Sequence, residues 1–280
     1  MQSLYKLITL LKKCCFTSSE ISKSDLEKDN QTTETKENPL STSFQKAYPL
    51  SLETLKLTLK VQETVFMDPG IEYEILPSGL KNSKRNIKDG CVYAGSIEKF
   101  GRLVINDIVL PFNEKGTGKR QFMIQYNKEQ NKYFIKDMGE GLGTFIRIEI
   151  PIKLHTSYTF VYGDTHMIVY IENTILKLKF IQGPKADSIY IFTPNESPIK
   201  IGRMSDCNIK IEDSGLSRYH CLAYYDNCWM FTDGDGQKNS TNGTWLFAEK
   251  FFEINNGMMI RTGETVFKAQ FTSDMLNIIE

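Results

Sequence analysis

Three side chains in the last third of the sequence have the chemistry needed to bind a phosphorylated peptide. Arg203 follows Gly202 at the end of an alternating run, Ser217 comes 14 residues later, and Asn242 stands in the polar turn 241–244. An arginine fork suits two phosphate oxygens and stays charged at any relevant pH, and a serine hydroxyl can bond to another oxygen. The asparagine amide both donates and accepts, which suits the main chain of an extended peptide.

Short alternating runs predict the strands that would position these turns. From residue 52 onward such runs lie between Gly, Asn, Asp and Pro breaks, and no convincing helical period persists. Clear examples cover residues 55–61, 71–76, 102–110, 122–126 and 132–137. Many short strands with regular turn signals are typical of an all-β sandwich or barrel. In a sandwich, the turns that carry the three side chains can gather at one end of the two sheets.

The strand pattern occurs twice. The run LKLTLKV at residue 55 recurs as LKLKFIQ at residue 176. Gly143-Thr144 corresponds to Gly243-Thr244, and residues 162–171 correspond to 262–271, both at an offset of 100. A repeat of this kind predicts two β-domains of similar plan, over residues 52–175 and 176–280.

The motifs of the second half resemble the signature of the forkhead-associated (FHA) domain. Gly202-Arg203, the run 217–220 (SRYH) and the run 242–244 (NGT) occur in that family's order and spacing, and the resemblance covers roughly residues 176–272. It implies an eleven-strand β-sandwich that binds phosphothreonine peptides through loops at one end. The whole chain then resembles a tandem FHA protein with an intact C-terminal domain and a degenerate N-terminal FHA-like repeat.

The resemblance also implies a role for each residue of the site. Arg203 and Ser217 would hold the phosphate, Arg218 would add a second contact, Thr241 would shape the pocket, and Asn242 would grip the peptide backbone. His220 would brace the recognition loops without touching the ligand. The expected phosphopeptide-binding residues are Arg203, Ser217, Arg218, Thr241 and Asn242. The expected structural supports are Gly202, His220 and Gly243.

The first half keeps the strand pattern without the ligand chemistry. Gly95 matches Gly202, but Ser96 follows it, and an insertion comes next. Alignment places Gly118 and Gln121 at the positions of Ser217 and His220, and Gly141 and Leu142 at those of Thr241 and Asn242. A scaffold or partner surface is the favoured interpretation, and a different anion site built from Arg102, Lys119 and Arg120 is the alternative.

Composition argues against several other functions. Lys+Arg and Asp+Glu both number 34, so the formal charge is zero and no long basic patch supports nucleic-acid binding. No metal-ligand spacing, paired carboxylates or nucleophile-base set is present, so we expect no metal, no cofactor and no enzyme activity. The six cysteines form no disulfide framework, which favours a reducing, intracellular and cytoplasmic setting.

The N-terminal segment is open to several interpretations. Residues 1–16 predict a short amphipathic helix with basic residues, and residues 17–51 have the composition of a flexible linker. The helix could lie on an anionic membrane with Cys14 and Cys15 as palmitoylation sites, dock in a partner groove, or act as a transit peptide. It could equally be a plain tail.

Two functional hypotheses follow from the sequence. The first is a phosphothreonine-dependent adaptor or scaffold whose C-terminal FHA domain binds phosphorylated proteins. The second is a structural subunit of a larger cytoskeletal or organellar assembly, in which the sandwiches are docking surfaces and the pocket is vestigial. An open pocket at Arg203 would favour the first hypothesis, and a pocket filled by protein would favour the second.

Overall fold

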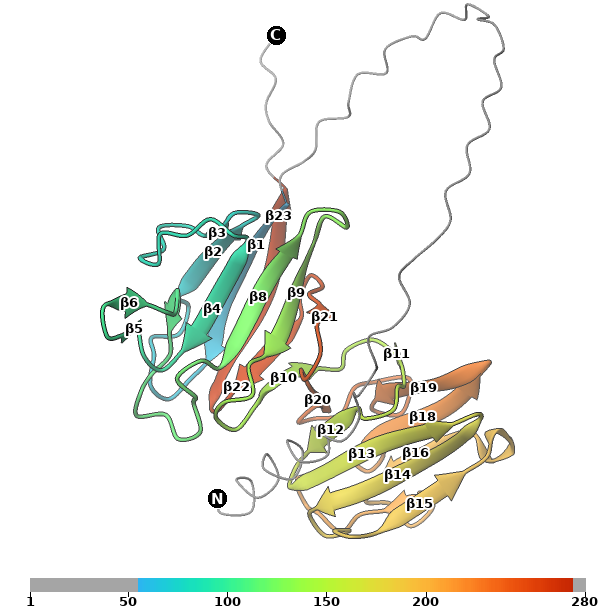
Figure 1. Ribbon diagram of the computed structural model, residues 1–280. Helices are drawn as coiled ribbons and strands as arrows, with labels where there is room; N and C mark the ends of the chain where they lie inside the picture. The colour runs from blue at the N-terminus through green and yellow to red at the C-terminus, as the bar shows by residue number, and fades with distance from the viewer. Residues whose placement is uncertain (1–54, 274–280) are drawn as a thin grey trace, which may run out of the picture. The chain divides into compact units, whose positions relative to one another are not determined.

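The computed structural model describes residues 55–273 (Figure 1). Apart from the 3₁₀ turn η1 (Pro194–Glu196), the regular structure in this range is entirely β-strand, which confirms the expected all-β class. The predicted helix 1–16 and linker 17–51 lie outside the described residues. No helix within 55–273 has the length and apolar character needed to cross a membrane.

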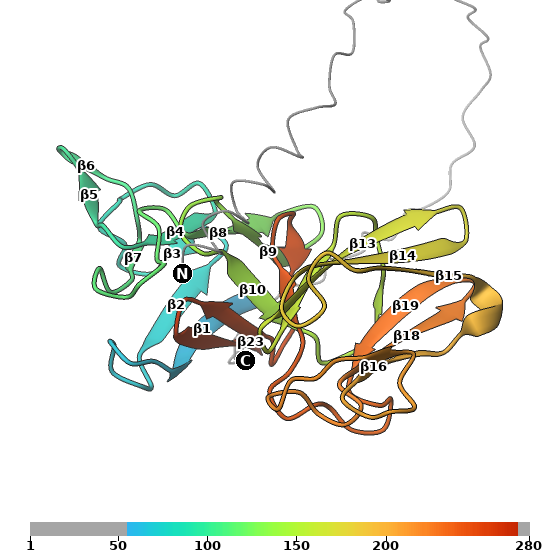
Figure 2. The same cartoon turned by 90° about the horizontal axis from the view of Figure 1, so that it is seen from below.

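The first of two sandwiches is built around the N-terminal repeat. One layer contains β4 (Cys91–Gly95), β7 (Ile108–Val109), β8 (Phe122–Asn127), β9 (Lys132–Asp137) and β21 (Phe252–Glu253). The other layer contains β1 (Leu55–Glu63), β2 (Glu72–Leu76), β3 (Gly79–Leu80), β10 (Thr144–Arg147), β22 (Met259–Thr262) and β23 (Thr265–Ser273). A separate hairpin of β5 (Lys99–Phe100) and β6 (Leu103–Val104) extends from this sandwich (Figures 1 and 2).

The second sandwich has the same plan. One layer contains β11 (Ile152–Lys153), β16 (Ile199–Gly202), β17 (Ile209–Lys210), β18 (Cys221–Asp226) and β19 (Cys228–Asp233). The other contains β12 (Thr159–Tyr162), β13 (Thr165–Glu172), β14 (Ile175–Gln182), β15 (Ile189–Phe192) and β20 (Trp245–Phe247). Alternation sets the burial: in β14, Leu176, Leu178 and Phe180 are fully buried while the lysines between them are half-buried on the opposite face.

The last three strands of each repeat belong to the sandwich of the other repeat. From the first repeat, β11 pairs with β19, β12 with β20, and β13 with β14. From the second repeat, β21 pairs with β9, β22 with β10, and β23 with β1. We call this arrangement the strand exchange. The bounds 52–175 and 176–280 expected for the two β-domains are those of the sequence repeats, and each sandwich contains strands from both repeats.

The two segments at which the chain crosses between the sandwiches explain the exchange. Residues 148–151 (IEIP) and 248–251 (AEKF) contain no Gly, Asn or Asp, the residues that tight reversals of the chain favour. Pro151 also biases the preceding residue toward an extended conformation. The chain therefore continues past β10 and β20 instead of folding back beside them.

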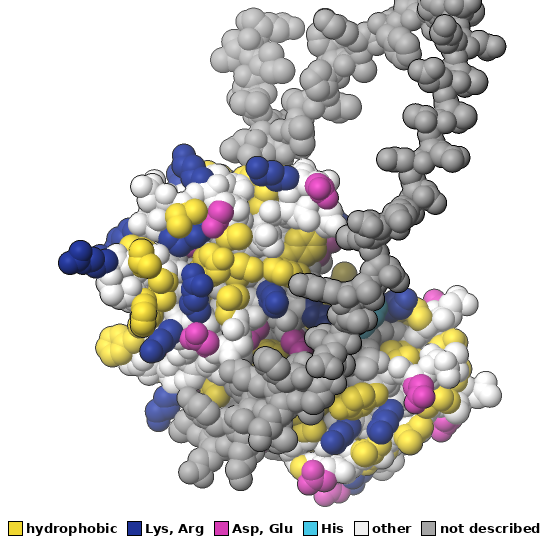
Figure 3. Space-filling model, viewed as in Figure 1, with side chains coloured by type: hydrophobic (Ala, Val, Ile, Leu, Met, Phe, Trp, Pro, Cys, Tyr) yellow, Lys and Arg dark blue, Asp and Glu magenta, His cyan; other side chains and the backbone are white. Residues whose placement is uncertain are grey.

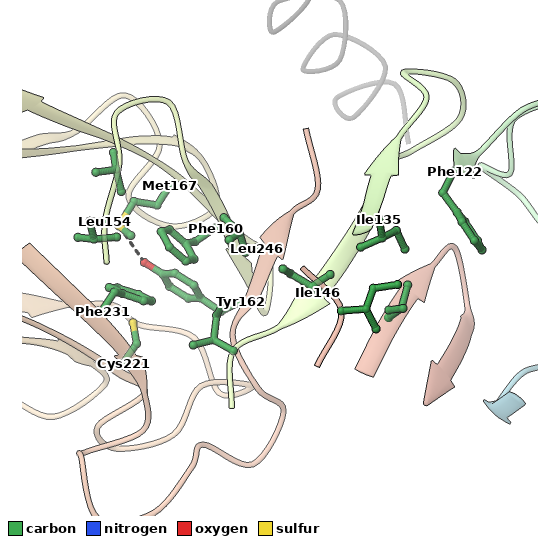
Figure 4. Packing of buried hydrophobic residues seen from close by; sticks show 14 of the residues in the cluster. Phe122, Ile135, Ile146, Leu154, Phe160, Tyr162, Met167, Cys221, Phe231 and Leu246 are labelled. Carbon is green, nitrogen blue, oxygen red and sulfur yellow. Dashed lines mark hydrogen bonds between the residues drawn. The ribbon is translucent and has the colours of Figure 1, made fainter. Parts of the chain in front are cut away.

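The two central strands pair at equivalent positions. In the antiparallel register of β10 and β20, Ile146 lies opposite Leu246, its counterpart at the offset of 100, and Arg147 lies opposite Trp245. This pairing joins the large layers of both sandwiches into one 11-stranded sheet. Most buried apolar side chains form one continuous core, with Ile146 and Leu246 between the residues of the two sandwiches (Figure 4). Val161, Trp245 and Val266 form a second, smaller cluster.

Candidate functional site

A pocket of about 240 Å³ lies among the loops that follow β16, β17 and β19. It is lined by Arg203, Ser217, Arg218, Tyr219, Asp235, Lys238, Asn239 and Thr241. Four of the five expected binding residues are therefore brought together. The fifth, Asn242, follows Thr241 but does not line the pocket, and its Nδ2 donates a hydrogen bond of 2.8 Å to the backbone oxygen of Gly215.

Backbone contacts place Arg203 beside Ser217. The N–H of Arg203 donates to the carbonyl of Ser217 at 3.5 Å, and the N–H of Met204 donates to the carbonyl of Arg218 at 3.2 Å. A Cβ at position 202 would overlap the carbonyl oxygen of Arg218. Glycine is therefore required there for the two loops to approach, and this contact puts the Arg203 and Ser217 side chains into the same pocket.

Ser217 also connects its loop to the polar turn. The N–H of Thr241 donates to Ser217 Oγ at 3.0 Å, and the two hydroxyl oxygens lie 3.4 Å apart. Ser217 is half-buried, whereas Arg203 and Arg218 are exposed. One hydroxyl and two exposed cationic forks are thus available to an anion that enters the pocket.

His220 supports this loop from the interior. Its side chain is fully buried and does not line the pocket. Its Nδ1 accepts a 3.1 Å hydrogen bond from the backbone N–H of Ser217. The backbone N–H of His220 donates to the carbonyl of Ile201 at 2.8 Å, and the centre of its ring lies 5.3 Å from that of Tyr162. Burial lowers the pKa of His220. A neutral imidazole is the form that can accept the Ser217 N–H.

A buried aspartate that the sequence analysis did not select organises the polar turn. Asp233 accepts hydrogen bonds from Ser240 N–H at 2.8 Å, from Ser240 Oγ at 2.7 Å and from Thr244 Oγ1 at 2.7 Å. Its exposed fraction is only 2%. The signal that could have identified it is an aspartate at the end of a strand, and Asp137 ends the equivalent strand β9 in the first repeat.

The first repeat contributes directly to the second pocket's surroundings. The carboxylate of Asp213 accepts the N–H of Gly215 at 2.8 Å and that of Asp164, in the β12–β13 turn, at 3.4 Å. Arg147 of β10 packs on the turn after Asn242, where a Cβ at Gly243 would lie 3.1 Å from Arg147 Cζ. Through the strand exchange, the site therefore contains supports from both repeats.

The pocket has an excess of positive charge. Arg203, Arg218 and Lys238 face one acid, Asp235. The Asp235 carboxylate accepts backbone N–H groups from Lys238 and Gln237, both at 3.0 Å, and these bonds lower its pKa. Lys238 and Asn239 were not singled out from the sequence, because a lysine or asparagine in a polar loop carries no local signature.

The equivalent loops of the first repeat touch each other. Gln121 Oε1 accepts the Gly118 N–H at 2.7 Å, as His220 does from Ser217, so the two sites have the same internal frame. However, a Cβ at Gly118 would overlap Glu140, and the N–H of Leu142 bonds to Gly116 at 2.6 Å. The position equivalent to Ser217 is thus a glycine in direct contact with the neighbouring loop, and Ser96 stands at the position equivalent to Arg203.

The alternative anion site of the first repeat is not assembled around Arg120. Its Nη2 donates to the backbone oxygen of Ile105 at 3.2 Å, and its Cζ lies 4.3 Å from the centre of the Tyr93 ring. Within residues 55–273, no group of three His, Cys, Asp or Glu side chains is arranged to hold a metal ion. The pocket of the second repeat, with Arg203, Arg218 and Lys238 in its lining, is suited to holding an anion by hydrogen bonds and charge.

Comparison with known families supports both repeats. A family model described as the FHA domain matches residues 99–163 and residues 199–266. Each matched region starts in one sandwich and ends in strands that the exchange has placed in the other. No curated protein matches the chain.

Proposed function

Because the chain is a tandem FHA-domain protein, we propose that it is an adaptor or scaffold whose second FHA repeat binds phosphothreonine-containing partners. FHA domains are phosphopeptide-binding interaction modules, not catalysts. The observation that carries the proposal is the convergence of Arg203, Ser217 and Arg218 on one open, positively charged pocket.

The contacts around the pocket suggest how the ligand is held. A phosphate carries about −1.5 to −2 charges near pH 7. Arg203 gives it two charge-assisted hydrogen bonds, Ser217 Oγ gives a third, and Arg218 closes the opposite side. Lys238, exposed in the loop before Thr241, adds charge without a fixed geometry.

The peptide backbone is held by Asn242. Its amide bonds to Gly215 in the structure, and a bound peptide takes over or extends this bond. Asn242 follows Thr241, which lines the pocket. An extended peptide can therefore place its phosphothreonine in the pocket and its neighbouring main chain on Asn242.

The proposal is tested with a pool of fluorescent peptides that have phosphothreonine at a fixed position and mixed flanking residues, compared with the same pool unphosphorylated. We expect the full-length protein to bind only the phosphorylated pool. Since each charge-assisted hydrogen bond contributes about 1.5–3 kcal/mol, Arg203→Ala should weaken binding by roughly 10- to 100-fold or more.

The matched control is Arg102→Ala, which removes an exposed arginine from the first repeat. It should leave binding to the phosphorylated pool unchanged. Equal binding of phosphorylated and unphosphorylated pools would contradict the proposal.

The second candidate is a structural subunit of a larger assembly, with the sandwiches as docking surfaces and a vestigial pocket, and the first repeat supports its docking role. Its recognition loops are closed on each other at Gly118 and Leu142. We infer that the first repeat supplies docking surfaces and strands, while the second supplies ligand recognition.

A further inference from the structure

The insertion of the first repeat forms a projecting hairpin. Gln121 follows Gly95 by 26 residues, whereas the equivalent His220 follows Gly202 by 18, so the first repeat has 8 extra residues here. The extra chain includes β5 and β6, which pair only with each other and extend away from the sandwich (Figures 1 and 2). The pocket of the second repeat has no counterpart of this hairpin.

The insertion exposes large apolar side chains. Phe100 is 67% exposed, Leu103 is 71% exposed, and Phe112, which follows β7, is 86% exposed. Phe100 lies directly opposite Leu103 in the hairpin, so both side chains project from the same face of it. Figure 3 shows hydrophobic side chains on the surface of this part of the first sandwich, with Lys and Arg side chains among them. Adjacent exposed groups of this size mark a surface that contacts another molecule.

The charges around these side chains are positive. Each acid between Gly95 and Gln121 is engaged elsewhere: Glu98 pairs with Lys84 at 2.8 Å, Asp107 pairs with Arg85 at 3.1 Å, and Glu114 is buried, where it accepts the N–H of Thr265 at 3.0 Å. The insertion's exposed cations form no salt bridge within the described part of the chain. They are Lys99, Arg102, Lys115 and Lys119.

We propose that this hairpin docks the protein on an anionic membrane surface. Phe100 and Leu103 at the tip enter the boundary between headgroups and acyl chains, where apolar side chains leave water. Lys99 and Arg102 remain at headgroup level and attract anionic lipids such as phosphatidylserine. A projecting tip with apolar and cationic groups and no free acid matches a negatively charged lipid surface in both charge and shape.

The test measures co-sedimentation of the full-length protein with vesicles of phosphatidylcholine alone and of phosphatidylcholine mixed with phosphatidylserine. We expect binding to the mixed vesicles only, and a large loss of it near 1 M salt, where the Debye length is about 3 Å. Phe100→Ser combined with Leu103→Ser should reduce binding by about 10-fold or more, because two apolar anchors are removed. Lys99→Glu combined with Arg102→Glu should reduce it comparably.

The matched control is Val65→Ser combined with Phe66→Ser, a second exposed apolar pair in a loop, at 70% and 39% exposure. It should bind the mixed vesicles like the wild type. Thermal unfolding of each variant tests whether the fold is retained. Amide hydrogen exchange across residues 99–104 should slow when mixed vesicles are added, which distinguishes the hairpin from any other lipid contact of the chain.

Three results would overturn the proposal. These are undiminished vesicle binding by the Phe100/Leu103 double variant, equal binding to both kinds of vesicle, and no vesicle binding by a wild-type protein whose hairpin instead captures a protein partner. None of them affects phosphopeptide binding, which depends on Arg203 and is measured separately.

Discussion

His220 and Gln121 occupy equivalent positions in the two repeats, and each accepts the backbone N–H of the residue three positions before it. Aligning the two repeats predicted this equivalence, because strand alternation fixes the register on both sides. The sequence also predicted that Arg203 and Ser217 share a pocket. Lys238 could not be predicted in the same way, since its role depends on which loops meet in space.

Buried histidine makes the stability of the protein depend on pH. His166, in β13, is 6% exposed, and burial lowers its pKa to about 4, with the positive charge of Arg261 acting in the same direction. The unfolded chain therefore binds more protons than the folded protein between about pH 4 and 6.5. The free energy of unfolding should fall by about 2 kcal/mol from this group as the pH drops from 7 to 5.

Denaturant unfolding at both pH values checks this expectation. His166→Gln should reduce the pH dependence, and part of it should persist because burial lowers the pKa of His220 as well. The exposed His155 provides the control, and His155→Gln should keep most of the wild-type dependence. An unchanged pH dependence in His166→Gln would refute the assignment.

At the scale of the elements, the β12–β13 and β22–β23 turns make equivalent contacts with the loops that follow β17 and β7. The β12–β13 turn meets the carboxylate of Asp213, and the β22–β23 turn meets the carboxylate of Glu114. Strand positions and Gly-acid turns were both predictable from alternation and turn chemistry. The pairing partners of β10 and β20 could not be predicted from alternation, because an alternating run fits either sheet equally well. The absence of a turn signal in residues 148–151 was the informative feature.

Substitution in one exchanged turn should affect a pocket formed mainly by the other repeat. Gly163 has φ +53°, and a Cβ there would lie 2.6 Å from Asp213 Oδ2. Gly163→Ala should cost about 1–2 kcal/mol in the left-handed region and displace the loop 213–217. We expect weaker binding of the phosphothreonine peptide pool, by several-fold, in a polarisation titration.

The matched change is Gly263→Ala in the equivalent turn, where φ is +54° and the new Cβ would meet Glu114. It should lower stability to a similar degree, as thermal unfolding will show, while peptide affinity stays at the wild-type level. Equal losses of affinity in both variants would mean that the effect is general destabilisation.

At the scale of the whole molecule, the strand exchange predicts that neither repeat folds alone. A fragment of residues 176–280 lacks β11, β12 and β13, which cover β19, β20 and β14. A fragment of residues 1–175 lacks β21, β22 and β23, which pair with β9, β10 and β1. Each fragment by itself leaves long sheet edges unpaired and core side chains exposed.

We expect each fragment to have weak near-ultraviolet circular dichroism and rapid proteolysis, and an equimolar mixture to recover the signals of the intact chain. Phosphopeptide binding should return only in the mixture. Cooperative unfolding and peptide binding by the 176–280 fragment alone would contradict the exchange.

The strand exchange has a consequence for how the sequence of this chain can change over generations. The first repeat carries Ser96 and Gly118 where the second has Arg203 and Ser217, and substitutions at these positions leave the pocket of the second repeat intact. The first repeat is not free to lose its last three strands, since they complete the neighbouring sandwich and hold up the loops that still carry Arg203 and Ser217. Any constraint on the pocket at Arg203 and Ser217 therefore also constrains the last three strands of the first repeat.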